Sequence, residues 1–153
     1  MGNDTMSNQL TADEQASLQL IAGMMIPASA KHGAPGADDD AIFADILRSF
    51  GRDEVAVKQA MTHLHHLSGG AFAALDAGQR AAVATDFRAS GGIALMRLTN
   101  IVLQCYYRDD RVMRSLGMEP RPPFPKGFEV EQGDWSLLDP VRKKEKIWRD
   151  APA

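Results

Sequence analysis

The chain has 153 residues, a net charge of −3 and a single cysteine. A chain of this length forms one domain whose core needs no metal ion or disulfide, and its small, mixed charge argues against nucleic acid as the main partner. No stretch reaches the about 18–20 apolar residues of a membrane span, which predicts no membrane insertion. The polar start lacks a signal-peptide pattern, so the sequence as written predicts a cytoplasmic protein.

The first half of the chain carries the start and stop signals of helices. Thr11 and Glu14 match a capping box that opens a first helix, and residues 26–27, an Ile-Pro pair, end it. Residues 38–40 are three aspartates, which favour the positive end of a second helix. Gly51 is expected to end that helix, because glycine adopts the left-handed backbone that helix ends require.

Two more helices are predicted from the same kind of start and stop signals. Asp53 is expected to cap a third helix that continues to about Leu67. Asp76 and Gln79 repeat the capping-box pattern for a fourth helix, which residues 90–92 close. The sequence therefore alternates helices with short loops, and no series of strands is predicted.

The fifth predicted helix, residues 93–107, is apolar on more than one face. Such a helix is buried on all sides, either in the centre of a bundle or under a partner, and we take it as the central helix. A short turn at 112–116 and Gly117 follow. The predicted fold is all-α, a compact helical bundle of about five to six helices with a long irregular proline-rich C-terminal arm.

The predicted domain boundaries follow from this pattern. Residues 1–10 form a flexible N-terminus, residues 11–117 the helical core, and residues 118–153 an extended arm and tail of the same domain. Residues 118–125 of the arm contain four prolines, which favour an extended path with few internal hydrogen bonds. It suits docking by its side chains, on its own domain alone or also on a second protein.

The histidines, the cysteine and the methionines of the chain fit structural roles better than catalytic or metal-binding ones. The histidines of residues 63–66 lack acidic companions at ligand spacing, which favours a polar helix face over a metal site. Cys105 lies among apolar neighbours, which indicates a core cysteine and not a nucleophile. No phosphate-binding glycine loop is present, so no cofactor is expected on this chain. The methionines are spaced for core packing: Met24, Met25, Met61 and Met96.

Residues 106–112 (Tyr-Tyr-Arg-Asp-Asp-Arg-Val), Leu116-Gly117, the proline-rich arm and residues 138–142 (Leu-Asp-Pro-Val-Arg) occur in an order and spacing that resembles a known family. This family is the small, or gamma, subunit of FAD-dependent gluconate 2-dehydrogenase and related sugar dehydrogenases. The likeness covers most of the chain, from the first helix, which ends in residues 25–28 (Met-Ile-Pro-Ala), to the C-terminal tail. It departs from the family pattern at Asp110, where a proline is usual, and in lacking a twin-arginine export signal.

The resemblance implies a non-catalytic accessory subunit, not an enzyme. Its partner would be a large flavoprotein of the glucose-methanol-choline type, whose FAD oxidises a sugar, glycoside or other alcohol. The small subunit would support folding, stability or flavin loading, in the cytoplasm as written or in the periplasm if a leader is missing. The residues expected to contact the partner are aromatic: Tyr106, Tyr107, Phe124, Phe128 and Trp135.

A different class of function stays open beside this one. A free-standing helical module could hold a small ligand or a peptide between its helices. Substrate specificity would belong to the large subunit, and this sequence predicts neither the electron acceptor nor the stoichiometry of a complex.

Overall fold

The structure is a computed structural model, and it describes residues 10–121, 127 and 129–146. The chain divides into two compact units, residues 1–120 and residues 121–153, and each is described by itself. Within the described residues the regular elements are helical, and the only β-type pairing there is an isolated bridge between Ser29 and Ala34. The all-α prediction is therefore confirmed.

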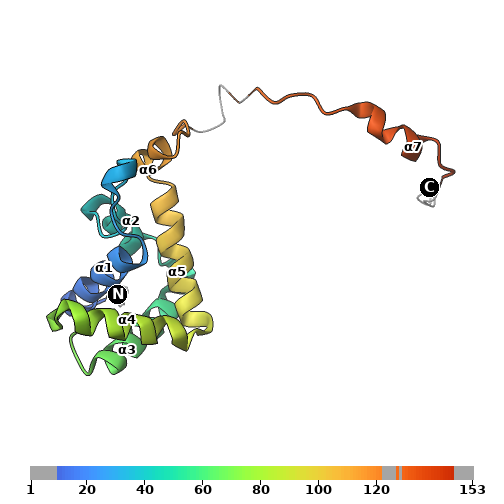
Figure 1. The fold of residues 1–153 in the computed structure, drawn as a ribbon. Helices are drawn as coiled ribbons and strands as arrows, with labels where there is room; N and C mark the ends of the chain where they lie inside the picture. The colour runs from blue at the N-terminus through green and yellow to red at the C-terminus, as the bar shows by residue number, and fades with distance from the viewer. Residues whose placement is uncertain (1–9, 122–126, 128, 147–153) are drawn as a thin grey trace, which may run out of the picture. The chain divides into compact units, whose positions relative to one another are not determined.

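The described part of unit 1 contains six α-helices and three 3₁₀ turns, and residues 26–39 form the longest connection, between α1 and α2 (Figure 1). The helices are α1 (Ala12–Met25), α2 (Asp40–Arg48), α3 (Glu54–Ser68), α4 (Ala77–Ser90), α5 (Gly92–Tyr107) and α6 (Asp110–Ser115). The 3₁₀ turns are Ala30–His32, Gly51–Asp53 and Phe72–Ala74.

Two helices begin at the capping boxes that the sequence predicts. At the start of α1, the backbone N–H of Glu14 donates to Thr11 Oγ1 at 3.2 Å, and the backbone N–H of Thr11 donates to Glu14 Oε2 at 2.8 Å. At the start of α4, Asp76 and Gln79 exchange the equivalent bonds at 2.9 and 3.0 Å. Each box satisfies two backbone donors that a helix start otherwise leaves free.

The junction between α2 and α3 differs from the prediction. Helix α2 ends at Arg48, and Gly51 begins a 3₁₀ turn that runs directly into α3. Asp53 makes no capping bond, because its backbone has near-helical angles in place of the extended conformation of an N-cap. Its carboxylate lies 3.7 Å from Arg97 of α5 instead. A contact with a distant helix thus replaces the expected local cap.

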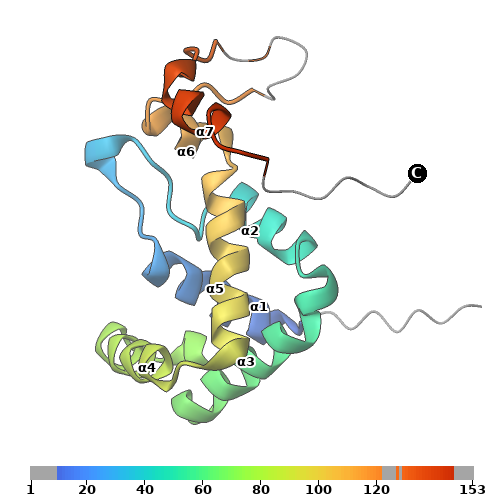
Figure 2. The ribbon, with the colours of Figure 1, turned by 90° about the vertical axis from the view of Figure 1, so that its right-hand side faces the viewer.

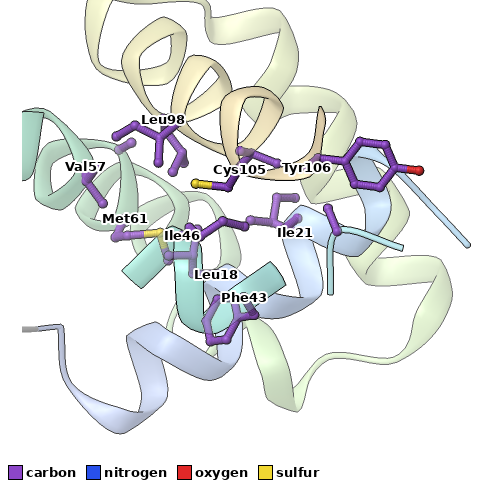
Figure 3. Close-up of a cluster of buried hydrophobic side chains, with 14 of the residues drawn as sticks. Leu18, Ile21, Phe43, Ile46, Val57, Met61, Leu98, Cys105 and Tyr106 are labelled. Atoms are coloured by element: carbon purple, nitrogen blue, oxygen red, sulfur yellow. The ribbon is translucent and has the colours of Figure 1, made fainter. Parts of the chain in front are cut away.

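Helix α5 spans unit 1, with α6 at one end and α3 and α4 at the other (Figures 1 and 2). Its core side chains, among them Leu98 and Cys105, face α1, α2 and α3 (Figure 3). Cys105 is a free cysteine in this core, as the sequence predicts, and burial raises the pKa of its thiol. A thiol with a raised pKa is a poor nucleophile, which agrees with a packing role.

Unit 2 contains a short helical segment within the arm that the sequence analysis expected to be irregular. A 3₁₀ turn at Trp135–Leu138 continues into α7 (Asp139–Arg142). The carboxylate of Asp134 accepts from the backbone N–H of Ser136 at 3.0 Å, which caps the turn. The apolar side chains of the segment are exposed: Trp135, Leu137, Leu138 and Val141.

Candidate partner-binding surface

The outward side of α5 carries a continuous row of large side chains, which we name the α5 stripe. Its members are exposed residues three or four positions apart: Ile93, Met96, Asn100, Leu103 and Tyr107. This spacing places them on one face of the helix over about 21 Å. The four large apolar members are 36–72% exposed. The stripe is apolar except for the amide at its centre.

The stripe corrects the expectation that α5 is buried on all sides in the centre of its own bundle, and burial under a partner stays a prediction. The opposite face, with Leu98, Val102 and Cys105, packs into the core, mainly on α3 and α2. Helices α1 to α4 cover only that half of α5, and within the described part of unit 1 the stripe stays exposed. An apolar row of this length on a surface is typical of a site that binds another protein.

A groove adjoins the stripe between the end of α1, α4 and α5. It has a volume of about 330 Å³, and its lining includes Leu95, Thr99 and Leu103. Leu103 belongs to both groove and stripe, so the two form one surface. Met24, at the groove, and Met96, on the stripe, are exposed, which corrects their expected place in the core. Their apolar neighbours also lie at the surface, so helical spacing alone could not separate the two faces.

The two tyrosines of the Tyr-Tyr motif have different environments. Tyr106 is 6% exposed, and its hydroxyl donates to the backbone oxygen of Pro35 at 3.1 Å. Tyr107 is 53% exposed and belongs to the stripe. The two rings pack edge to face, with centroids 5.2 Å apart. Tyr106 therefore orients Tyr107 and presents little surface of its own, and its expected contact with a partner stays a prediction.

Arg108 joins the end of α5 to α2. Its Nε donates to Asp45 Oδ2 at 2.6 Å, and its Nη2 donates to Ser49 Oγ at 2.6 Å. The hydrogen bond from Arg108 lowers the pKa of Asp45. Since Asp45 and Ser49 both belong to the end of α2, one guanidinium holds the two helices together.

Arg111 connects the N-caps of two helices. Asp39 caps α2 and Asp109 caps α6, through hydrogen bonds from backbone N–H groups to their carboxylates. The guanidinium of Arg111 donates to both oxygens of Asp39 at 2.6 and 3.0 Å and to both oxygens of Asp109 at 3.1 Å. These hydrogen bonds lower the pKa values of both carboxyls. The 106–112 motif thus fixes the end of α5 and the start of α6.

Replacing Tyr106 with Phe tests the hydroxyl contact with Pro35. The change removes one hydrogen bond and keeps the ring, so we expect the free energy of unfolding to fall by about 0.5–1.5 kcal/mol. Chemical denaturation of the full chain measures it. Replacing Tyr107 with Phe is the matched control, and it should change the stability less because that side chain is half exposed. Equal losses in both variants would contradict the assignment.

The other three residues expected to contact a partner belong to unit 2. Trp135 is 61% exposed in unit 2, while Phe124 and Phe128 fall outside the described residues.

The three histidines of the 63–66 cluster, His63, His65 and His66, are exposed on α3. Among the residues that the structure describes, no group of three or more His, Cys, Asp or Glu side chains could hold a metal ion. No helix in the same part of the chain is both long and apolar enough for a bilayer span.

Sequence reasoning missed Ile93, Met96 and Leu103 as surface residues. The sequence did contain a signal for this surface, because the three residues share a 3–4 spacing with Tyr107 that is offset from the spacing of Leu98 and Val102.

No protein-family model, curated protein or solved structure matches the chain. The resemblance noted in the sequence therefore supports a proposal and not a family assignment.

Proposed function

We propose that this chain is the non-catalytic small subunit of an FAD-dependent dehydrogenase of the glucose-methanol-choline type. The large partner subunit carries the FAD and oxidises a sugar, glycoside or other alcohol. This chain supports folding, stability or flavin loading of that partner. The proposal rests on the resemblance of residues 106–112 and 138–142 to the small subunits of gluconate 2-dehydrogenase and related enzymes. It rests also on a surface suited to a protein partner.

The α5 stripe is the observation that carries the proposal furthest. Aromatic and methionine side chains are enriched at protein interfaces, and the stripe has one of each beside Ile93 and Leu103. Its residues project from a helix that the core and the Arg108 and Arg111 contacts hold in place. A rigid surface loses little conformational freedom on binding, so more of the contact energy becomes affinity.

Such a surface also explains how a subunit without chemistry of its own assists a flavoprotein. A protein that binds only the folded form of another stabilises that form by mass action. The benefit grows with the concentration of this chain and with its affinity. The proposed support of folding and flavin loading therefore requires only binding, and no catalytic side chain on this chain.

Affinity purification of the full-length tagged chain from its native source tests the proposal. We expect a flavin-containing protein to be recovered with it, and the complex to oxidise a sugar or another alcohol with an artificial electron acceptor. The double variant Leu103→Glu/Tyr107→Glu should lose this protein, because it places two carboxylates on the stripe. The matched control is Gln59→Glu, at an exposed position on α3. Recovery of the wild-type chain without a flavoprotein would refute the proposal.

The groove favours a second candidate, a module that binds a small ligand or a peptide between its helices. Its volume of about 330 Å³ falls in the lower range of ligand pockets. Filling the groove by Thr99→Trp distinguishes the two functions. It should abolish binding of a groove ligand, whereas Ile93→Glu, at the far end of the stripe, should affect only a protein partner.

A further inference from the structure

We propose that two copies of this chain pair through their α5 stripes, as antiparallel helices related by a two-fold axis beside Asn100. The pair is the form of the chain without its flavoprotein, so this inference goes beyond the proposed function and does not depend on it. In the absence of the flavoprotein, the one occupant of the exposed face of α5 is the same face of a second copy.

The spacing of the stripe is nearly symmetric about Asn100. Ile93 and Tyr107 lie seven residues to either side, and Met96 and Leu103 lie four and three residues away. Two antiparallel copies centred on Asn100 therefore place Ile93 opposite Tyr107 of the second copy, and Met96 opposite Leu103. Each apolar side chain meets another apolar side chain, as a self-complementary two-fold interface requires.

Asn100 suits the centre of such a pair. A side-chain amide has both a donor and an acceptor, so two amides that meet at a two-fold axis can exchange a pair of hydrogen bonds. A single asparagine at a helix–helix seam fixes the register, because a shifted pairing buries its amide without a partner. The one polar member of the stripe thus stands at the only position where symmetry supplies it with an identical partner.

The polar side chains along one edge of the stripe are compatible with the same arrangement. Arg97 and Gln104 are on one edge, three residues before and four residues after Asn100. In an antiparallel pair, equivalent edges meet, so Arg97, which lies 3.7 Å from Asp53 of its own chain, faces the neutral Gln104 of the second copy and meets no like charge. The helix dipoles also oppose each other favourably in this orientation. No acidic side chain interrupts the stripe.

Opposite charges at position 100 provide the test. The full-length wild-type chain is expected to be a dimer by sedimentation velocity. Asn100→Asp and Asn100→Lys each place two like charges at the axis, so each variant alone should dissociate at least about tenfold more readily. An equimolar mixture of the two variants should recover the dimer, since a carboxylate then faces an ammonium group.

The matched controls change an exposed amide on a different helix. Gln59→Glu and Gln59→Lys make comparable changes of an exposed amide on α3 and should leave the dimer unchanged. A monomeric wild-type chain overturns the proposal, and so does a dimer that either Asn100 variant leaves intact. A mixture no more dimeric than its components also overturns it. A wild-type monomer that still recovers a flavoprotein would refute the pairing alone, while a dimer that recovers none would refute the proposed function alone.

Discussion

Replacing Leu98 with Ala is expected to lower the free energy of unfolding by about 2–5 kcal/mol. Leu98 is fully buried on the inner face of α5, which packs mainly against α3 (Figure 3). Truncation removes apolar surface from the core and leaves a cavity that the surrounding helices fill only in part. Urea denaturation of the full chain, followed by circular dichroism, measures the loss.

The same substitution one and a half turns further along α5 provides the control. Leu103 belongs to the stripe and is 36% exposed, so Leu103→Ala should cost less than about 1 kcal/mol in the monomer. The comparison must be made at a concentration where the chain is monomeric, because pairing would add stability. Similar losses for both variants would contradict the two-faced environment of α5.

Local signals predicted the helix starts well. The capping boxes at Thr11 and Asp76 were predictable because each joins residues only three positions apart. The predicted cap at Asp53 was wrong, because its carboxylate contacts Arg97, which lies 44 positions further along the chain. Sequence spacing does not encode such a contact. The helix starts at Thr11 and Asp76 were therefore visible in the sequence, while the α2–α3 junction and the short helical segment of unit 2 were not.

The candidate surface was harder to predict, for the same reason. The composition of α5 showed two apolar faces, but which face is covered depends on how α1 to α4 pack against it. The 106–112 motif was recognisable, and its structural contacts were not, because they join residues far apart. Arg108 and Asp45 are 63 positions apart, and Arg111 and Asp39 are 72 positions apart. Only the folded chain shows that Arg108 and Arg111 hold helices together.

Replacing Arg111 with Met is expected to cost about 1–2 kcal/mol at neutral pH. The change removes charge-assisted hydrogen bonds to Asp39 and Asp109 and leaves their two carboxylates close together. The Arg111 side chain is 45% exposed, so water and salt screen the interaction and keep the cost moderate. Arg114→Met removes an ion pair with Asp110 whose two side chains are 60% and 62% exposed, and it should cost less than about 0.5 kcal/mol.

The pH dependence of stability separates the charge interaction from lost packing. Arg111 lowers the folded-state pKa of Asp39 and Asp109 below the ordinary value of 3.8. Their contribution to stability is therefore complete well above that value, and it is lost as the pH falls through the lower, folded-state pKa values. Below about pH 4, wild-type stability should fall more steeply than that of Arg111→Met, and the two curves should converge in acid. Parallel curves from pH 7 into acid would show that Arg111 stabilises the α2–α6 contact by packing alone.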